Sequence, residues 1–480
     1  MSNRRRNARG VRTRKVMRAA TADLQSLGFG FRDLRKARAH GVRVRDIVAE
    51  SCRRAQALAD AGVFTELVPA ADAIKRAQAL EKRAAAGAVL PLLGLTFAVK
   101  DNIHVAGMAT TCNCPGFRIL PTESAPAVRA VEEAGAVLIG KNTLDQFATG
   151  LNGTRSPEPL CRNAVNPDYI PGGSSSGSAV AVARGVVSFA LGSDTGGSGR
   201  VPAACNGIVG LKPTLGLVSS RGLVYNSRYF DCIPVFAKSC GDAYEVLECI
   251  ACHDPADPYS RIDADDIPLS ARRCESAVIA MPQSDQLQFF GDTHARAAFE
   301  ANVKLIRGLG HKLREVDFTV FAEAGRHVFQ SAMVAERLCD YGEIFANNPA
   351  AIHPAVRAAI EPGRGYSAVD AFKALYHLKA LQRQAAAILN GCAALIVPTV
   401  PTIFTIVEML ADPMAKNAIM GTYTYFVNPL DLAAVSVPGR PRPDGLPSAI
   451  SFVGAAGTDG TLRYLARAFE RAVSASSRVQ

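Results

Sequence analysis

The sequence lacks any apolar run long enough to cross a membrane. A membrane-spanning helix needs about 18 or more consecutive, mainly apolar residues, and the chain contains no such run. No apolar stretch follows Met1, as a secretory signal would require. Its 12 cysteines show no paired spacings, and a chain of 480 residues can bury a large core without disulfides. We therefore expect a globular, cytoplasmic protein with reduced thiols and no membrane partner.

Acidic residues are missing from the start of the chain, where basic residues are dense. Eight arginines and lysines precede the first acidic residue, Asp23, and they supply most of the formal net charge of +11. Such a leader is a solvated disordered arm, a transit peptide or a nonspecific anion-binding arm. Blocks of like charge are most often disordered, so we interpret residues 1–26 as a basic tail. The remainder is nearly balanced, and no specific nucleic-acid partner is expected.

Motifs for cofactors and metals are also scarce. Residues 249–253 match the CxxCH pattern of covalent haem attachment. That attachment requires export to an oxidising compartment, for which no signal peptide is present. The two cysteines also lie in an apolar stretch with helical character. Cys112 and Cys114 lack further cysteines or histidines at zinc-finger spacing. We therefore expect no cofactor and no metal.

Short apolar segments alternate with helical stretches after a helical preamble at 27–90. This alternation predicts an α/β fold with one mixed sheet, extending through a core at 91–240 and a C-terminal half at 260–480. The expected strands lie within 91–99, 136–139, 187–191, 277–280, 394–397 and 449–453. The longest expected helices span 295–306 and 368–389.

Two turns rich in glycine and serine bracket one apolar helix and strand. The first spans 171–178 (PGGSSSGS) and the second 192–200 (GSDTGGSGR). Glycine and serine usually make turns, and Ser174 or Ser175 would cap the helix that follows. A phosphate-binding loop is a second interpretation, but the first turn lacks the Gly-Lys-Ser/Thr ending of a P-loop and contains no GxGxxG. The density of the two turns, together with Lys100, favours a catalytic site.

Lys100 ends a short apolar strand, where solvation is a poor explanation for a lysine. If that strand is buried, desolvation disfavours the ammonium form, and the lysine becomes a base near neutral pH. A serine hydroxyl needs such a base before it attacks a carbonyl. No histidine lies between Pro115 and Cys252. A serine–lysine arrangement is therefore more economical than a Ser-His-Asp triad.

These three segments resemble the amidase signature family over about residues 91–236. The resemblance implies one large mixed sheet flanked by helices on both sides, in a single amidase signature domain at 27–480. It implies amide hydrolysis by a Ser–cis-Ser–Lys triad. Ser198 would be the nucleophile, Ser174 the bridging serine after a cis peptide bond, and Lys100 the base. Ser174 would pass a proton from Ser198 to Lys100 and later return it to the leaving amine.

The loop Thr195-Gly196-Gly197-Ser198 offers consecutive backbone N–H groups with little side-chain obstruction. This pattern is suited to an oxyanion hole built from all four residues. Asp194 and Arg200 flank the loop, and we expect them to brace it as an ion pair.

Further segments resemble the allophanate hydrolase group of that family. They are residues 144–157, 199–204, 334–337, 367–372 and 421–424. The resemblance implies substrate contacts from Gly150, Arg337 and the residue eight positions before Arg337. That residue is Phe329 here, whereas a tyrosine is expected, so one hydroxyl donor is missing. The amidase part is expected alone, without the further C-terminal domain of many such enzymes.

Three classes of function follow from these residues. The first is release of ammonia from a small ureido acid, most directly allophanate, in urea or s-triazine nitrogen assimilation. The second is the same chemistry on biuret, guanylurea, malonamate or another small carboxamide. The third is a transamidation subunit that delivers ammonia to a charged RNA, with the basic tail as the RNA contact. The resemblance also implies homodimerisation as one arrangement of the chain.

Overall fold

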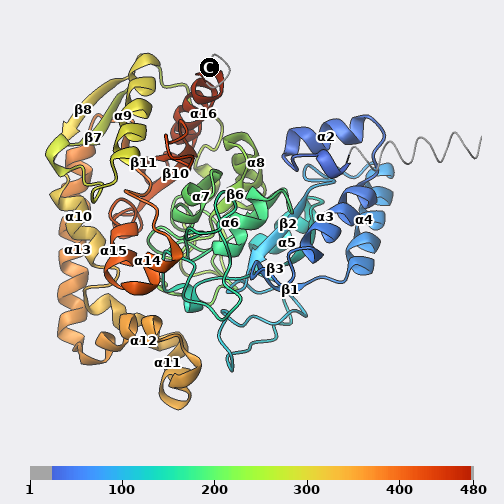
Figure 1. Cartoon of the computed structure of the whole chain (residues 1–480), viewed down its shortest axis with the longest axis horizontal. Helices are drawn as coiled ribbons and strands as arrows, with labels where there is room; N and C mark the ends of the chain where they lie inside the picture. The colour runs from blue at the N-terminus through green and yellow to red at the C-terminus, as the bar shows by residue number, and fades with distance from the viewer. Residues whose placement is uncertain (1–23, 477–480) are drawn as a thin grey trace, which may run out of the picture.

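Eleven strands form one mixed sheet in the computed structural model, which describes residues 24–476 (Figure 1). Across the sheet the strands follow the order β1-β3-β2-β4-β6-β5-β10-β11-β9-β7-β8. The sheet strands are β1 (Phe64–Leu67), β2 (Thr96–Lys100), β3 (Val137–Asn142), β4 (Phe189–Leu191), β5 (Val209–Lys212), β6 (Val235–Ala237), β7 (Val278–Pro282), β8 (Lys312–Val316), β9 (Ala394–Pro398), β10 (Leu432–Pro438) and β11 (Ala449–Ala455). The predicted single mixed sheet is confirmed.

The sheet has a parallel section in each half of the chain and an antiparallel centre. In the N-terminal half, β2 pairs in parallel with both β3 and β4. In the C-terminal half, β7 pairs in parallel with both β8 and β9. The two halves join where β10 pairs antiparallel with β5 on one side and with β11 on the other. The halves therefore share one sheet.

Helices cover both faces of the sheet, as the resemblance implied. The α-helices are α2 (Phe31–Ala39), α3 (Val44–Gln56), α4 (Ala70–Ala85), α5 (Pro126–Glu133), α6 (Ser176–Ala183), α7 (Val201–Cys205), α8 (Cys240–Ile250), α9 (Thr293–Gly308), α10 (Thr319–Arg326), α11 (Arg337–Asn347), α12 (Pro354–Ile360), α13 (Ala368–Leu389), α14 (Ile406–Ala411), α15 (Ala415–Met420) and α16 (Asp459–Ser476). Among residues 24–476, no helix combines the length and the apolar character needed to span a membrane.

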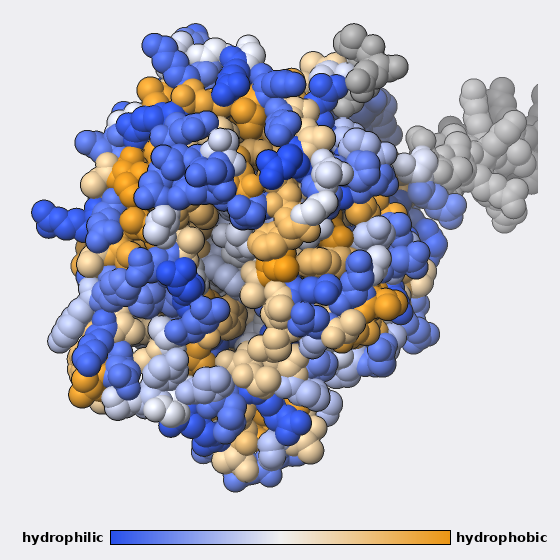
Figure 2. All heavy atoms as spheres, turned by 60° about the vertical axis from the view of Figure 1, so that its left-hand side comes forward, coloured by the Kyte–Doolittle hydropathy of each residue, from blue (hydrophilic) through white to orange (hydrophobic). Residues whose placement is uncertain are grey.

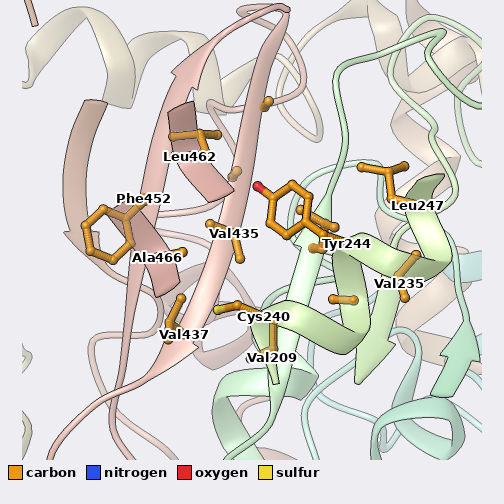
Figure 3. Close-up of a cluster of buried hydrophobic side chains, with 14 of the residues drawn as sticks. Val209, Val235, Cys240, Tyr244, Leu247, Val435, Val437, Phe452, Leu462 and Ala466 are labelled. Atoms are coloured by element: carbon orange, nitrogen blue, oxygen red, sulfur yellow. The ribbon is translucent and has the colours of Figure 1, made fainter. Parts of the chain in front are cut away.

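The apolar strands are buried on both sides, which explains why their sequences are continuous rather than alternating. In β2, Phe97 and Val99 belong to the largest hydrophobic cluster, whereas Ala98 faces a second cluster on the opposite side. Figure 3 shows part of the largest cluster, where Tyr244 of α8 and Leu462 of α16 lie over the strands. The second cluster packs α4 and α6 against the other face.

Two boundaries of the predicted organisation need correction. The preamble at 27–90 is not wholly helical, because β1 forms an antiparallel edge strand beside β3. The boundary at residue 26 is too late, because Leu24 is buried in the largest hydrophobic cluster. Arg54 donates a hydrogen bond to the Leu24 carbonyl, which further fixes this segment. The tail before residue 24 lies outside the described residues.

The sheet topology places Lys100 and the second glycine and serine turn at the same edge of the sheet. Because β2 and β4 are parallel neighbours, their carboxyl ends lie at the same edge of the sheet. Lys100 ends β2, and the second turn begins directly after β4. The parallel pairing of β2 and β4 therefore places Lys100 beside the second glycine and serine turn.

Candidate active site

Lys100 lies in the interior without an acidic partner. Its side chain is fully buried, and its Nζ donates to Ser174 Oγ at 2.7 Å and to Ser193 Oγ at 2.8 Å. Among residues 24–476, no carboxylate forms a salt bridge with this ammonium group. The predicted contact between Lys100 and Ser174 is therefore present in the structure.

The surroundings of Lys100 favour its neutral form. Burial lowers the pKa of Lys100 from 10.5 to about 7, although Asp231, Asp145 and Asp194 partly oppose the shift. At neutral pH an appreciable fraction of the amine is therefore unprotonated. A neutral amine at this distance can accept a proton from Ser174.

Ser174 lies in the first turn, immediately before α6, and the peptide bond between Gly173 and Ser174 is cis, as the resemblance implied. Asp145 N–H donates to the Ser174 carbonyl at 3.1 Å. The Asp145 carboxylate accepts backbone N–H bonds from Gly153 at 3.0 Å and Arg155 at 2.9 Å. Asp145 therefore ties the first turn to the segment around residue 153.

Gly173 is required by this arrangement. A Cβ atom at Gly173 would lie 2.1 Å from Asp145 Oδ2 and 2.7 Å from the Gly153 nitrogen. Any larger residue would displace either the turn or Asp145. The glycine thus permits the close approach of backbone segments beside Ser174.

The second turn is organised around the Asp194 carboxylate. It forms an ion pair with Arg200 at 3.0 Å, and both side chains are fully buried. It also accepts the N–H of Gly197 at 2.7 Å and of Gly199 at 2.9 Å. The predicted ion pair is confirmed, and it holds both residues that flank Ser198.

One of the four N–H groups predicted for an oxyanion hole is already engaged. Gly197 N–H was expected to point at the substrate, but it is already bonded to Asp194. In the described part of the chain, the N–H groups of Thr195, Gly196 and Ser198 donate no hydrogen bond. Three of the four expected donors therefore remain free for a ligand.

Ser198 is buried but not sealed, with 3% of its surface exposed. Within residues 24–476 its hydroxyl makes no hydrogen bond, so the structure contains the Lys100–Ser174 link of the relay but not the Ser174–Ser198 link. The two turns nevertheless pack together, because the Ser175 hydroxyl donates to the Ser193 carbonyl at 3.2 Å. Figure 2 shows a hollow in the middle of one face, with residues of intermediate hydropathy at its floor.

Arg337 is a second buried cation without an acidic partner. It begins α11, and only 1% of its surface is exposed. Its Nε donates to Asn226 Oδ1 at 3.1 Å, and its Nη2 donates to the Val328 carbonyl at 3.0 Å. No carboxylate among the described residues pairs with it. Its charge is therefore available to a ligand.

Phe329 contacts Arg337 through its ring. The guanidinium carbon lies 4.7 Å from the ring centroid, which is within range of a cation–π contact. On the other side, the ring lies 5.1 Å from that of Tyr425. The Phe329 ring therefore positions the guanidinium, and the side chain offers no hydrogen-bond donor.

Gly150 follows Thr149, and Asn226 connects Thr149 to Arg337 by hydrogen bonds. The Asn226 amide donates to Thr149 Oγ1 at 2.8 Å and accepts from Arg337. A Cβ at Gly150 would lie 2.5 Å from Asp145 Oδ2. The three residues expected to bind substrate are thus linked to one network.

Sequence reasoning missed several polar residues of this site. Ser193 accepts hydrogen bonds from Lys100 and, at 3.1 Å, from Asn102. Asp231 accepts from the Thr195 hydroxyl, and burial raises the pKa of Asp231 to about 7. The position of Ser193 directly after a buried strand was a usable signal. Asp231 and Asn226 carry no local signal, because only the tertiary fold brings them here.

Comparison with known proteins identifies the family. The family model described as Amidase matches residues 46–462. The chain belongs to the amidase family. This is an enzyme family whose chemistry is directed at carbon–nitrogen bonds.

Two groups stand out among the individual relatives. Urea amidolyase of Saccharomyces cerevisiae is 39% identical over 79% of the chain, which spans only 21% of that protein. The solved Kluyveromyces lactis allophanate hydrolase is 36% identical, with a TM-score of 0.82 over 90% of this chain and 73% of that one. In the second group, a glutamyl-tRNA(Gln) amidotransferase subunit of an Exiguobacterium species is 33% identical over 90% of this chain and 94% of that protein.

Proposed function

We propose that the chain is an amidohydrolase that releases ammonia from a small ureido or amide acid, with allophanate as the principal substrate. The similarity to urea amidolyase and allophanate hydrolase supports this substrate. With allophanate, the reaction would belong to urea or s-triazine nitrogen assimilation.

One observation carries the catalytic part of the proposal. Lys100 and Ser174 form a 2.7 Å hydrogen bond in the interior, and burial lowers the pKa of Lys100 to about 7. Burying a lysine without an acidic partner destabilises the folded protein, and such lysines with a shifted pKa are concentrated at functional sites. A base of that pKa is suited to proton transfer at neutral pH.

The proposed reaction proceeds in two stages. Lys100 takes a proton from Ser174, and Ser174 takes one from Ser198, whose Oγ attacks the substrate carbonyl. The relay then returns a proton to the leaving nitrogen of the tetrahedral intermediate, whose C–N bond breaks to release ammonia and leave an acyl group on Ser198. Water, deprotonated by the same relay, releases the acid and restores Ser198. The Ser174–Ser198 hydrogen bond would form on substrate binding, since catalytic hydrogen bonds are often long in empty sites.

The charged end of the substrate would contact Arg337. A buried guanidinium without an acid favours a carboxylate, which it can bind through two parallel hydrogen bonds. The free N–H groups of Thr195, Gly196 and Ser198 would stabilise the oxyanion at the other end. Loss of one such donor commonly reduces the rate by about 100-fold or more.

Ammonia release from allophanate by the purified chain tests this proposal. Ser198→Ala, prepared identically, should reduce the rate by at least about 1000-fold, because the nucleophile is lost. Biuret, guanylurea and malonamate, measured alongside, define the substrate. If the chain hydrolyses another amide but not allophanate, the serine–lysine mechanism would stand and allophanate would be rejected as the substrate.

Transamidation is the second candidate, favoured by the nearly full-length match to an amidotransferase subunit. Such a subunit would depend on partner chains and an acceptor RNA. Efficient ammonia release by the isolated chain, unchanged by added salt, would reject this candidate. Release only in the presence of a partner and an acceptor would favour it over free hydrolysis.

A further inference from the structure

The Tyr341 hydroxyl is buried without a hydrogen-bond partner. Only 1% of the residue is exposed, and its oxygen makes no hydrogen bond within the described residues. Buried tyrosine hydroxyls usually find a partner, and an unsatisfied one destabilises the protein. A phenylalanine would fill the same space without this penalty. The Thr149 side chain lies near the hydroxyl but forms no hydrogen bond with it, so the hydroxyl is free to donate to a bound ligand.

This hydroxyl faces the same region as the unpaired guanidinium. Tyr341 lies four residues after Arg337, at a kink in α11, and after burial itself the Arg337 charge is the next influence on the phenol. Burial raises the pKa of Tyr341, so the phenol keeps its proton at neutral pH and can donate it. Two donors without a salt-bridge partner among the described residues thus lie in one region, linked by Phe147, which stacks on Tyr341, and by Asn226, which bonds to both Phe147 and Arg337.

The neighbouring carboxylate is already engaged. Glu336 accepts from the Ser227 hydroxyl at 2.5 Å and from the Arg228 N–H at 2.6 Å. Both of its oxygens are therefore engaged by other groups, and it forms no salt bridge with Arg337 among the described residues.

Tyr341 also contacts the segment that carries Gly150. Its ring stacks on Phe147 at 4.5 Å between centroids, and Thr149 lies beside its hydroxyl. Asn226 links Thr149 to Arg337. The ring is therefore held between α11 and the 147–150 segment, next to the arginine.

We propose that Tyr341 is a specificity-determining residue whose hydroxyl, together with Arg337, binds the carboxylate of a small anionic amide. This proposal rests on the proposed function, because it assigns the group that recognises the charged end of that substrate. It also explains how the site acts without a hydroxyl at position 329, where Phe329 stacks on the guanidinium. The site would select acids over neutral amides.

Binding to the Ser198→Ala background separates recognition from turnover. Malonamate, which carries a carboxylate, and malonamide, its neutral counterpart, would be titrated by calorimetry. Adding Tyr341→Phe should weaken malonamate binding by about 10-fold to 150-fold, the range expected for a lost hydrogen bond to a charged group. Malonamide binding should change by less than about twofold. In the otherwise wild-type enzyme, the loss should appear mainly in KM for malonamate.

Thermal stability provides an independent readout. Without ligand, Tyr341→Phe should leave Tm unchanged or raise it, because it removes an unsatisfied hydroxyl. Tyr423→Phe is the matched control, since the buried Tyr423 hydroxyl donates to the Gln288 carbonyl at 3.1 Å and accepts the Gln288 N–H at 2.6 Å. That control should lower Tm without changing the preference for malonamate. Phe329→Tyr in the Tyr341→Phe background tests whether a hydroxyl at the neighbouring position restores binding.

The outcomes distinguish the two proposals. Equal loss for malonamate and malonamide, or no loss for either, would overturn the role of Tyr341. Absence of malonamate binding to Ser198→Ala would also overturn it. Selective carboxylate binding in a chain that hydrolyses no amide would support Tyr341 and reject the proposed function.

Discussion

Lys100 shows how a single residue acquires reactivity from its position. It ends a buried strand, contacts two serine hydroxyls and has no acidic partner among the described residues. Desolvation lowers its pKa to about 7, so the folded protein favours the neutral amine as pH rises through that value. We therefore predict that kcat/KM rises with pH and levels off above about 7. A pH–rate profile checks this.

Lys100→Ala is the matching variant for that profile. It should remove both the activity and the rise near neutral pH, because no base remains beside Ser174. A profile in Lys100→Ala that keeps the wild-type inflection at appreciable activity would assign the titration to another group.

Asp194 has a structural role at the same scale. It holds Arg200 and two backbone N–H groups in the interior. We predict that Asp194→Ala lowers the free energy of unfolding by about 3–5 kcal/mol, because it leaves a buried charge unpaired. Urea denaturation measures this loss.

The exposed pair between Arg273 and Glu275 is the control for Asp194. Its side chains are 78% and 60% exposed, so Glu275→Ala should change the free energy of unfolding by less than about 1 kcal/mol. Equal effects of the two substitutions would refute the assigned role of Asp194.

At the scale of elements, the turn before α6 depends on close backbone packing. A Cβ at Gly173 would meet Asp145 and the Gly153 backbone. We predict that Gly173→Ala reduces kcat by about 100-fold or more by shifting Ser174, since small misplacements of reacting groups have effects of this size. Steady-state kinetics on the folded variant checks the prediction.

Gly308 is the matched control for Gly173, because no atom lies within 4 Å of a Cβ built there. It ends α9, where alanine is favoured over glycine by up to about 1 kcal/mol. Gly308→Ala should leave kcat unchanged. A comparable loss of activity in both variants would contradict the argument from packing.

Strand prediction succeeded where burial on both faces produced a short apolar run. β2, β3, β4, β7, β9 and β11 all fall within or beside predicted segments. The edge strands β1 and β8 were missed because one face is solvated and their sequences, FTEL and KLREV, carry polar residues. β10 was missed because its alanines do not distinguish strand from helix. The short strands β5 and β6 were also missed, although both are fully buried.

At the scale of the molecule, the site combines segments that local patterns cannot connect. Lys100 and the two turns were identifiable because they follow buried strands. Arg337, Phe329 and Gly150 were found only through family resemblance. Tyr341 was not found, because its importance depends on an unsatisfied hydroxyl that only the packed structure reveals.

The shared sheet makes a prediction about unfolding. Because β10 of the C-terminal half pairs directly with β5 of the N-terminal half, the two halves bury a common core. We predict one cooperative unfolding transition, with coincident loss of secondary and tertiary structure. Calorimetry together with near- and far-ultraviolet circular dichroism measures this. Two separated transitions would show that the halves are independent domains.

Detection of a covalent intermediate tests the central claim most directly. Wild-type protein would be mixed with malonamate or allophanate, quenched during turnover and analysed by mass spectrometry of the intact chain and its peptides. We predict an acyl group on Ser198 of the wild-type protein and none on Ser198→Ala. The variant should also release no ammonia above background. An acyl group on another residue, or undiminished ammonia release by Ser198→Ala, would contradict it.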